Sequence, residues 1–306
     1  MAIKLTNLRD FVATVEEGSI RAAARRLRLN QSALTKSIQH LERTLEVELF
    51  HRLPRGLELT VYGKAYYSRA KAVTMDLQRG AEDIRHLKGL GGGQVAIGVS
   101  ATASLLFLPA AVEQFQARFP DTKLRIVGGS LVVMYPELRD GRLDFGIGPR
   151  PAQPLDGDFT LQPLFCQPHV VVCRPGHPLA RCTRLEDLID ASWLVGGATD
   201  LDLAAPVESF QSANLPAPAK TIRCEYPPAF LSLLMTGDHL MMLPKVWVDS
   251  MLGRHHLIAV PVRDRLQHTD ICVMRRRGLD PTPAASHLLT IFERLIASLL
   301  PPSTRP

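Results

Sequence analysis

The chain has 306 residues, of which 46% are hydrophobic and 22% are charged, a composition typical of globular proteins. This length fits two or three modest domains, each able to bury a core. No apolar run follows the charged first residues, and no apolar stretch reaches membrane-spanning length. We therefore expect a cytoplasmic protein without a secretory signal and without membrane contact.

The charge of the chain is distributed unevenly. Residues 1–90 carry 16 Lys and Arg against 10 Asp and Glu, whereas residues 91–306 carry 20 of each group. The formal net charge of +6 therefore lies entirely in the first third of the chain. A local basic excess on an otherwise balanced chain indicates a polyanionic partner. The alternative is that these basic residues simply form a solvated helix face.

The cysteines and histidines predict no special chemistry. The five cysteines are odd in number and form no CxxC pair, which excludes a disulfide framework and a zinc knuckle. We expect the cysteines to be small, mostly buried side chains. A redox pair of Cys173 and Cys182 is the alternative. The ten histidines are scattered, and neither Cys nor carboxylates cluster beside His255 and His256. We expect no metal site and no cofactor.

The N-terminal residues predict a helix-turn-helix. Apolar residues from Leu5 to Val15 recur at helical spacing, and Gly18 ends this first helix. Ser19 and Asn30 are suited to cap a short second helix and a longer third one. The turn between them carries Arg28 and Leu29 where Gly is common. The third helix has one apolar face, formed by Leu34, Ile38, Leu41 and Leu45.

A hairpin and a long helix follow. Pro54 and Gly56 predict a tight turn, which makes this segment a small wing with basic residues near its tip. From Thr60 to about Lys88 a narrow apolar stripe predicts a helix of roughly 40 Å. Such a helix usually pairs with a copy of itself; packing on its own domain is the alternative. The glycines of residues 89–93 predict a linker.

Strands and helices alternate from residue 94 onward. This alternation predicts an α/β fold with parallel sheets and helices on both faces. Two lobes joined by crossover strands are expected, and a single domain of about 210 residues is the alternative.

The sequence resembles the LysR-type transcriptional regulators. The resemblance is carried by FVATVEEGSIRAAARRLRLNQSALTKSIQHLERTLEVELFHR and LELTVYGK, and continues in RFP at 118–120, LRDGRLDFGI at 138–147 and CRPGHPLA at 173–180. It implies a winged helix-turn-helix domain at residues 1–60, a dimerising linker helix at 61–90 and a two-lobed, periplasmic-binding-protein-like α/β domain at 91–306. Lobe I is expected at about 91–164 with 267–306, and lobe II at about 165–266.

The same resemblance implies the partners. It predicts double-stranded promoter DNA, a small-molecule effector and a homotetramer built as a dimer of dimers; RNA polymerase is a candidate further partner. The function expected is a sequence-specific transcriptional regulator that is switched by the effector.

The DNA-binding residues are expected on the third helix and the wing. The start of a recognition helix contacts base edges in the major groove. By resemblance, the base-facing positions are Gln31, Ser32, Thr35 and Lys36, and Arg55 is the wing arginine of the minor groove. Many family members have Pro where Ser32 stands. Arg21, Arg25 and Arg52 are expected to hold phosphates. Solvated helix residues are the alternative.

The effector site is expected where strands end against helix starts, because free N–H groups favour an anion there. Ser100 is the foremost candidate. A small carboxylate or sulfonate is expected, and simple helix caps are the alternative. The candidate residues are Ser100, Ala101, Thr102, Ser130, Thr199 and Pro227.

Three other classes of protein fit less well. A solute-binding protein would need an export signal in place of the basic helical domain. An enzyme is not expected, because the chain has no GxSxG, HExxH or phosphate-loop motif. A constitutive architectural DNA-binding protein would not need the large neutral α/β part.

Overall fold

The structure, a computed structural model, describes residues 2–53, 56–87, 93–128, 131–151, 158–196, 204–250, 253–278 and 280–300. The chain separates into two compact units, residues 1–93 with 136–143 and residues 94–135 with 144–306. No helix within the described ranges is long and apolar enough to cross a membrane.

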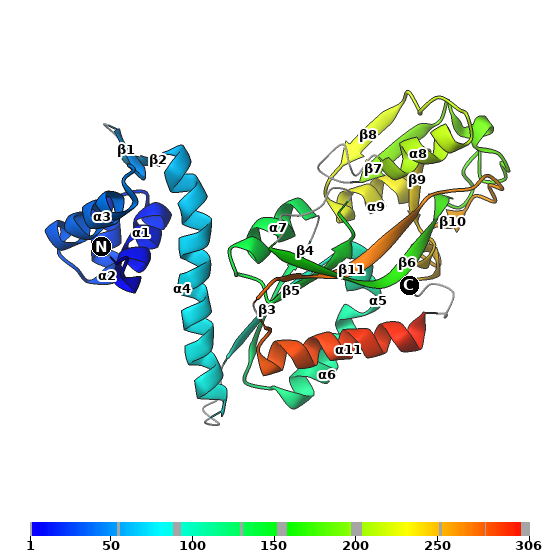
Figure 1. Cartoon of the computed structure of the whole chain (residues 1–306). Helices are drawn as coiled ribbons and strands as arrows, with labels where there is room; N and C mark the ends of the chain where they lie inside the picture. The colour runs from blue at the N-terminus through cyan, green and yellow to red at the C-terminus, as the bar shows by residue number, and fades with distance from the viewer. Residues whose placement is uncertain are drawn as a thin grey trace. The chain divides into compact units, whose positions relative to one another are not determined.

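The N-terminal unit begins with three short helices, drawn in blue in Figure 1: α1 (Leu5–Glu17), α2 (Ile20–Leu27) and α3 (Gln31–Leu45). Gly18 ends α1 with a left-handed backbone at φ 66°. Ser19 caps α2, because its Oγ accepts a hydrogen bond of 3.2 Å from the backbone N–H of Ala22. Arg28 adopts φ 55° in the turn before α3, a conformation that costs a side chain more than it costs Gly.

Two apolar clusters hold these helices together. The fully buried ring of Phe11 contacts Phe50 edge-on, with 5.4 Å between ring centroids, and also lies beside Tyr66 and Tyr67. A second cluster joins α1, α2 and α3 through Ala13, Ala23, Ala24 and Leu34. The small alanine side chains let α2 and α3 approach closely.

A two-stranded wing and the long helix α4 complete this unit. Strands β1 (Phe50–Leu53) and β2 (Gly56–Leu59) pair antiparallel. The Glu42 carboxylate of α3 fixes the start of the wing by accepting a hydrogen bond of 2.8 Å from the Leu49 N–H. Helix α4 runs over Val61–Leu87. Gly63 allows its first turn to approach the wing, since a Cβ there would lie 2.1 Å from the Leu49 carbonyl oxygen.

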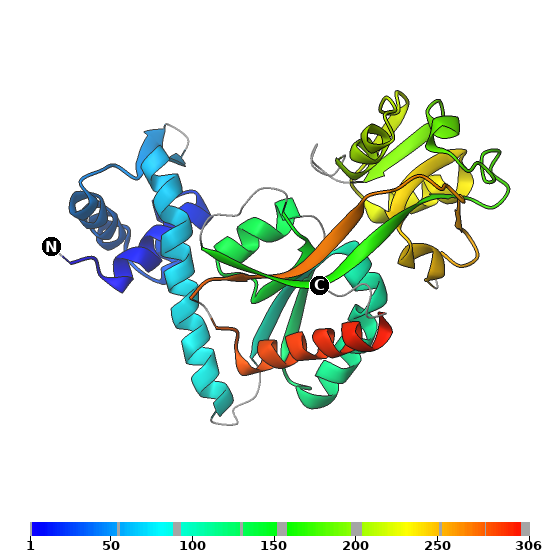
Figure 2. The same cartoon turned by 45° about the vertical axis from the view of Figure 1, so that its right-hand side comes forward.

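The second unit contains two α/β lobes. The first has the strands β3 (Gln94–Val99), β4 (Lys123–Gly128) and β5 (Phe145–Pro149), and the helices α5 (Ala101–Leu106), α6 (Leu108–Arg118) and the C-terminal α11 (Pro283–Leu299). Helix α7 (Leu131–Arg139) begins in this lobe, and its residues from Pro136 onward are assigned to the N-terminal unit. Helices α6 and α11 lie side by side against these strands (Figures 1 and 2). Phe145, Phe292 and Phe115 are fully buried in the core that they share.

The second lobe is built around three further strands. They are β7 (Ser192–Gly196), β8 (Thr221–Cys224) and β9 (His239–Pro244), with the short strand β10 (Ile258–Ala259) beside them. The helical segments are η1 (Leu185–Leu188), α8 (Ala204–Ser212), α9 (Pro227–Thr236) and α10 (Val246–Asp249). The rings of Trp193 and Phe210 are buried in an apolar cluster of this lobe and contact each other edge-on.

Two long strands connect the lobes. Strand β6 (Phe159–Cys173) pairs antiparallel with β11 (His268–Arg276) and then, from His169, with β9. In Figure 2 the two strands run together from one lobe into the other. The sheet order is β4-β3-β5-β11-β6-β9-β7-β8, with β10 on β6. The expected parallel pairing holds for β3 with β4 and β5, and for β7 with β8 and β9. The crossover strands β6 and β11 pair antiparallel instead.

Candidate nucleic-acid interface and effector site

Helix α3 separates its residues into a buried and an exposed face. Leu34, Ile38 and Leu41 are buried against α1 and α2, so the apolar side of the helix is used for folding. Gln31, Ser32 and Lys36 are exposed in its first two turns. These side chains face solvent and can reach a partner, as a recognition helix requires.

Local hydrogen bonds order the start of α3. Asn30 caps the helix: its Oδ1 accepts a hydrogen bond of 2.8 Å from the Ala33 N–H. The Ser32 hydroxyl donates to the same oxygen at 2.9 Å, and the Thr35 hydroxyl donates to the Gln31 carbonyl at 2.8 Å. Both hydroxyls therefore keep their acceptor lone pairs. Gln31 and Lys36 are left as the donors with the longest reach.

The arginines of α2 divide into two groups. Arg26 lies 2.8 Å from a Glu16 carboxylate oxygen and 3.2 Å from a Glu17 oxygen, and the hydrogen bond to Glu16 raises the pKa of Arg26. Arg21 and Arg25 are exposed and form no ion pair within the described residues. These two, which the sequence assigns to phosphates, are thus available to an anionic backbone.

The wing arginines are placed only in part. Arg52 belongs to β1, where its Cα lies opposite that of Leu57. Arg55 lies outside the described residues.

Ser100 occupies the end of β3 and caps α5. Its side chain is buried, with 6% of the residue exposed, and its Oγ accepts a long hydrogen bond of 3.5 Å from the Ala103 N–H. The Ser100 N–H donates to the Ile147 carbonyl at 2.8 Å, which ties Ser100 to β5. Ser100 is therefore held at the strand ends where the sequence predicts an effector site.

Thr102 has a partner that the sequence did not reveal. The indole N–H of Trp247 in α10 donates to the Thr102 hydroxyl at 2.9 Å, and both residues are buried. Ala101 and Leu105 of α5 pack against the apolar cluster that contains Trp247 and Phe230. Helix α5 thus bridges the two lobes. No sequence signal links two positions 145 residues apart, so this contact is visible only in the fold.

The other effector candidates are dispersed along the second unit. Pro227 is the first residue of α9, the helix that contributes Phe230 to the cluster beside Ala101. Ser130 and Thr199 lie outside the described residues. A cavity of about 270 Å³ opens instead at the crossover strands, lined among others by Arg150, Phe165 and Asp270. It contains none of the predicted effector residues that the structure describes.

Two family models match the chain. Residues 5–64 match the bacterial regulatory helix-turn-helix protein, lysR family, and residues 88–296 match the LysR substrate binding domain. Together they span most of both compact units.

Named relatives are similar over nearly the whole chain. The HTH-type transcriptional regulator GbpR of Azospirillum brasilense is 30% identical over 285 residues, which are 91% of this chain and 83% of GbpR. The HTH-type transcriptional regulator TdcA of Escherichia coli is 25% identical over 288 residues, 94% of this chain and 92% of TdcA.

Solved structures have the same fold at lower identity. Full-length OxyR from Pseudomonas aeruginosa has a TM-score of 0.68 at 23% identity, covering 97% of this chain and 95% of its own. Full-length CbnR in complex with its target DNA has a TM-score of 0.63 at 19% identity, and the match covers 95% of this chain and 99% of the CbnR chain. The chain combines a winged helix-turn-helix, a long linker helix and a two-lobed α/β domain, and it belongs to the LysR family of DNA-binding transcriptional regulators, which are not enzymes.

Proposed function

We propose that the chain reads promoter DNA with Gln31, Ser32, Thr35 and Lys36 in the major groove, and that Arg55 enters the minor groove. In this proposal Arg21, Arg25 and Arg52 neutralise phosphates. The observation that carries it is the division of α3, whose apolar residues are buried while Gln31, Ser32 and Lys36 are exposed. The positive excess of residues 1–90 supports it, because phosphate neutralisation needs Lys and Arg near the duplex.

Lys36→Ala tests this assignment. Removing a contact to a base edge costs about 1–3 kcal/mol, so we expect the variant to bind its operator roughly 5- to 150-fold more weakly. If Lys36 contacts only a phosphate, we expect a smaller loss together with a salt slope reduced by about 1. The measurement is fluorescence anisotropy on the DNA upstream of the chain's own gene, titrated at several salt concentrations.

Arg43→Ala is the matched control. Arg43 is an exposed cation in the last turn of the same helix, where its Nε donates to the Gln39 carbonyl at 3.2 Å. Its removal lowers the net charge by the same amount but leaves the start of α3 unchanged. Equal losses in Lys36→Ala and Arg43→Ala would mean that charge alone drives binding, and an unchanged affinity in Lys36→Ala would refute the base-reading role.

We also propose that an anionic effector binds at the start of α5. The candidate contacts are Ser100, Ala101 and Thr102 with Ser130, Thr199 and Pro227. The buried cap at Ser100 supports this proposal, since the free N–H groups at the start of a helix attract anions. A panel of small carboxylates and sulfonates in a thermal-shift assay tests it; the absence of any shift would count against an anionic effector.

The assembly and the place of action complete the proposal. We propose the domain limits 1–60, 61–90 and 91–306, and a dimer of dimers paired through α4. The exposed apolar side chains Val73, Leu77 and Ile84 support pairing, because they form a stripe along one side of that helix. The tetramer acts on DNA in the cytoplasm, with RNA polymerase as a further partner. Sedimentation equilibrium of the full chain measures its oligomeric state.

A further inference from the structure

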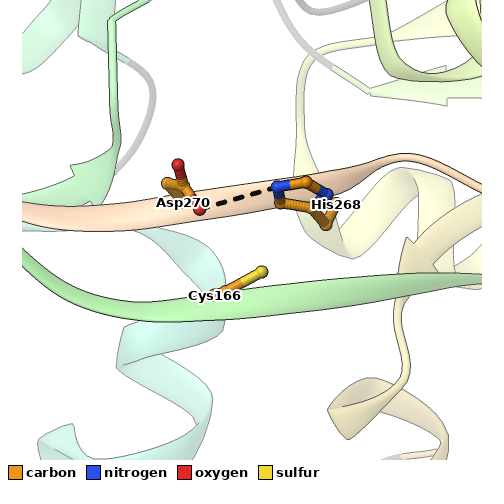
Figure 3. Close-up of side chains that lie close together, drawn as sticks. All are labelled: Cys166, His268 and Asp270. Carbon is orange, nitrogen blue, oxygen red and sulfur yellow. Dashed lines mark ion pairs between the residues drawn. The ribbon is translucent and has the colours of Figure 1, made fainter. Parts of the chain in front are cut away.

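Three side chains with metal-binding atoms lie together on the crossover strands. Cys166 belongs to β6, and His268 and Asp270 belong to β11. Figure 3 shows the three side chains gathered over the paired ribbons. One candidate ligand atom from each residue lies within 4.8 Å of the other two, and His268 Nε2 is 3.8 Å from an Asp270 carboxylate oxygen.

The strand register produces this arrangement. The Cα of Asp270 lies directly opposite that of Cys166, and His268 lies opposite Pro168. Residues opposite each other in a ladder share a face of the sheet, as do residues two apart on one strand. The Asp270 carbonyl also accepts a hydrogen bond of 2.8 Å from the Arg150 N–H. The backbone thus holds the three side chains together before any ligand arrives.

We infer that Cys166, His268 and Asp270 bind one divalent transition-metal ion, and that Zn²⁺ fits them best. A thiolate, an imidazole and a carboxylate are the three ligand types that Zn²⁺ uses, whereas Ca²⁺ and Mg²⁺ prefer oxygen ligands. Tetrahedral bonds of about 2.0–2.3 Å separate ligand atoms by about 3.3–3.8 Å. The three candidate atoms already lie within 4.8 Å of one another, which is close to that spacing.

The surroundings leave room for a fourth ligand. His268 and Asp270 are about half exposed, at 53% and 49% of their side chains, so an ion can enter from solvent. Cys166 and Asp270 also line the cavity of about 270 Å³, together with Arg150. A water molecule or a small anion fits the open position. Three protein ligands and one exchangeable ligand are the arrangement of an open zinc site.

The metal site lies where β6 changes its pairing partner. Strand β6 leaves β11 after Pro168 and pairs with β9 from His169 onward. The ion would tie β6 to β11 immediately before this change of partner, where the chain passes from one lobe to the other. The bound metal would therefore stiffen the junction between the lobes. This role is separate from the proposed DNA and effector sites.

A cobalt titration tests the inference. Full-length protein without an affinity tag is treated with chelator and titrated with Co²⁺, whose bond to a thiolate gives a near-ultraviolet charge-transfer band. We expect a band that saturates at one ion per chain and is displaced by Zn²⁺. Zn²⁺ should also slow hydrogen exchange in β6 and β11. Absence of the band in the wild-type chain would overturn the inference.

The variants assign the ligands. Cys166→Ser should abolish the band, and His268→Ala should weaken Co²⁺ binding at least tenfold. Cys182→Ser is the matched control, because Cys182 is a partly buried free thiol in another cluster, and it should keep the band. If Cys166→Ser fails to fold, the exposed positions His268→Ala and Asp270→Asn still decide the outcome. A band that survives these changes would place the metal elsewhere and refute the site.

Discussion

At the scale of single residues, Glu16 connects three helices of the N-terminal unit. Its carboxylate accepts a hydrogen bond of 2.6 Å from the Lys71 ammonium of α4 and one of 2.8 Å from Arg26 of α2. Lys71 is almost buried, with 9% of its side chain exposed, and its Nζ also donates to the Tyr67 hydroxyl at 3.0 Å. A buried ammonium needs such partners, because desolvation otherwise disfavours its charge.

We expect Glu16→Gln to destabilise the N-terminal unit by about 1–2 kcal/mol, since hydrogen bonds to charged groups are worth about that much and the site is partly exposed. Burial acts to raise the pKa of Glu16, but the hydrogen bonds from Lys71 and Arg26 outweigh it and the pKa is lowered from 4.5. The ionised form therefore stabilises the fold at neutral pH, and this contribution fades as the pH falls below about 4.5.

Urea unfolding at pH 7 and at pH 4 measures both effects. The wild-type chain should lose more stability on acidification than Glu16→Gln, which has no carboxylate to titrate. Glu17→Gln is the control, because Glu17 pairs with the half-exposed Arg26, at 3.2 Å between the carboxylate and the guanidinium. A Glu16→Gln variant as stable as the Glu17→Gln variant would show that the buried pair contributes little.

At the scale of elements, the sequence predicts the N-terminal unit more completely than the second unit. The caps at Ser19 and Asn30 are local signals, and both form the predicted hydrogen bonds. The loop candidates Arg55, Ser130 and Thr199 stay predictions, because they lie outside the described residues.

Strand β6 and helix α5 show where local signals fail. The residues HVVVC at 169–173 show the apolar run typical of a strand, but β6 begins at Phe159. Its first half is stabilised by pairing with β11, about 100 positions further along the chain. The six-residue helix α5 is too short to give a helical period. The metal site that we infer was not expected for the same reason: Cys166 meets His268 and Asp270 only through this strand pairing.

Ser100 gives a prediction at this scale, because it is both a helix cap and the foremost effector candidate. Ser100→Ala should lower the melting temperature of the ligand-free chain slightly, since losing a cap costs about 1 kcal/mol. If Ser100 also holds the effector, the variant should in addition lose the stabilisation that an active anion gives the wild-type chain. The thermal shift between ligand-free and ligand-bound protein separates the two roles. A reduced melting temperature with a full ligand shift would leave Ser100 as a cap only.

At the scale of the whole effector-binding unit, the two lobes are joined by more than their crossover strands. The Trp247 indole of one lobe donates to the Thr102 hydroxyl of the other at 2.9 Å. Thr102 is also one of the predicted effector contacts, and its hydroxyl still has a proton to donate. A ligand that accepts this proton would therefore bind at the hydrogen bond that holds α5 to α10, which links effector binding to the contact between the lobes.

A double-mutant cycle of Thr102→Val and Trp247→Phe tests this link. Thr102→Val leaves the buried indole N–H without a partner and should cost about 1–3 kcal/mol, whereas in the Trp247→Phe background the same change should cost about 1 kcal/mol less. Urea unfolding of the four proteins gives the coupling energy. Thr102→Val should also diminish the effector-induced thermal shift if the hydroxyl contacts the ligand. Coupling near zero would mean that the hydrogen bond does not stabilise the lobe contact, and a full ligand shift in Thr102→Val would remove Thr102 from the effector site. Because the two readouts are independent, the cycle distinguishes a residue that only joins the lobes from one that also transmits the presence of the effector to them.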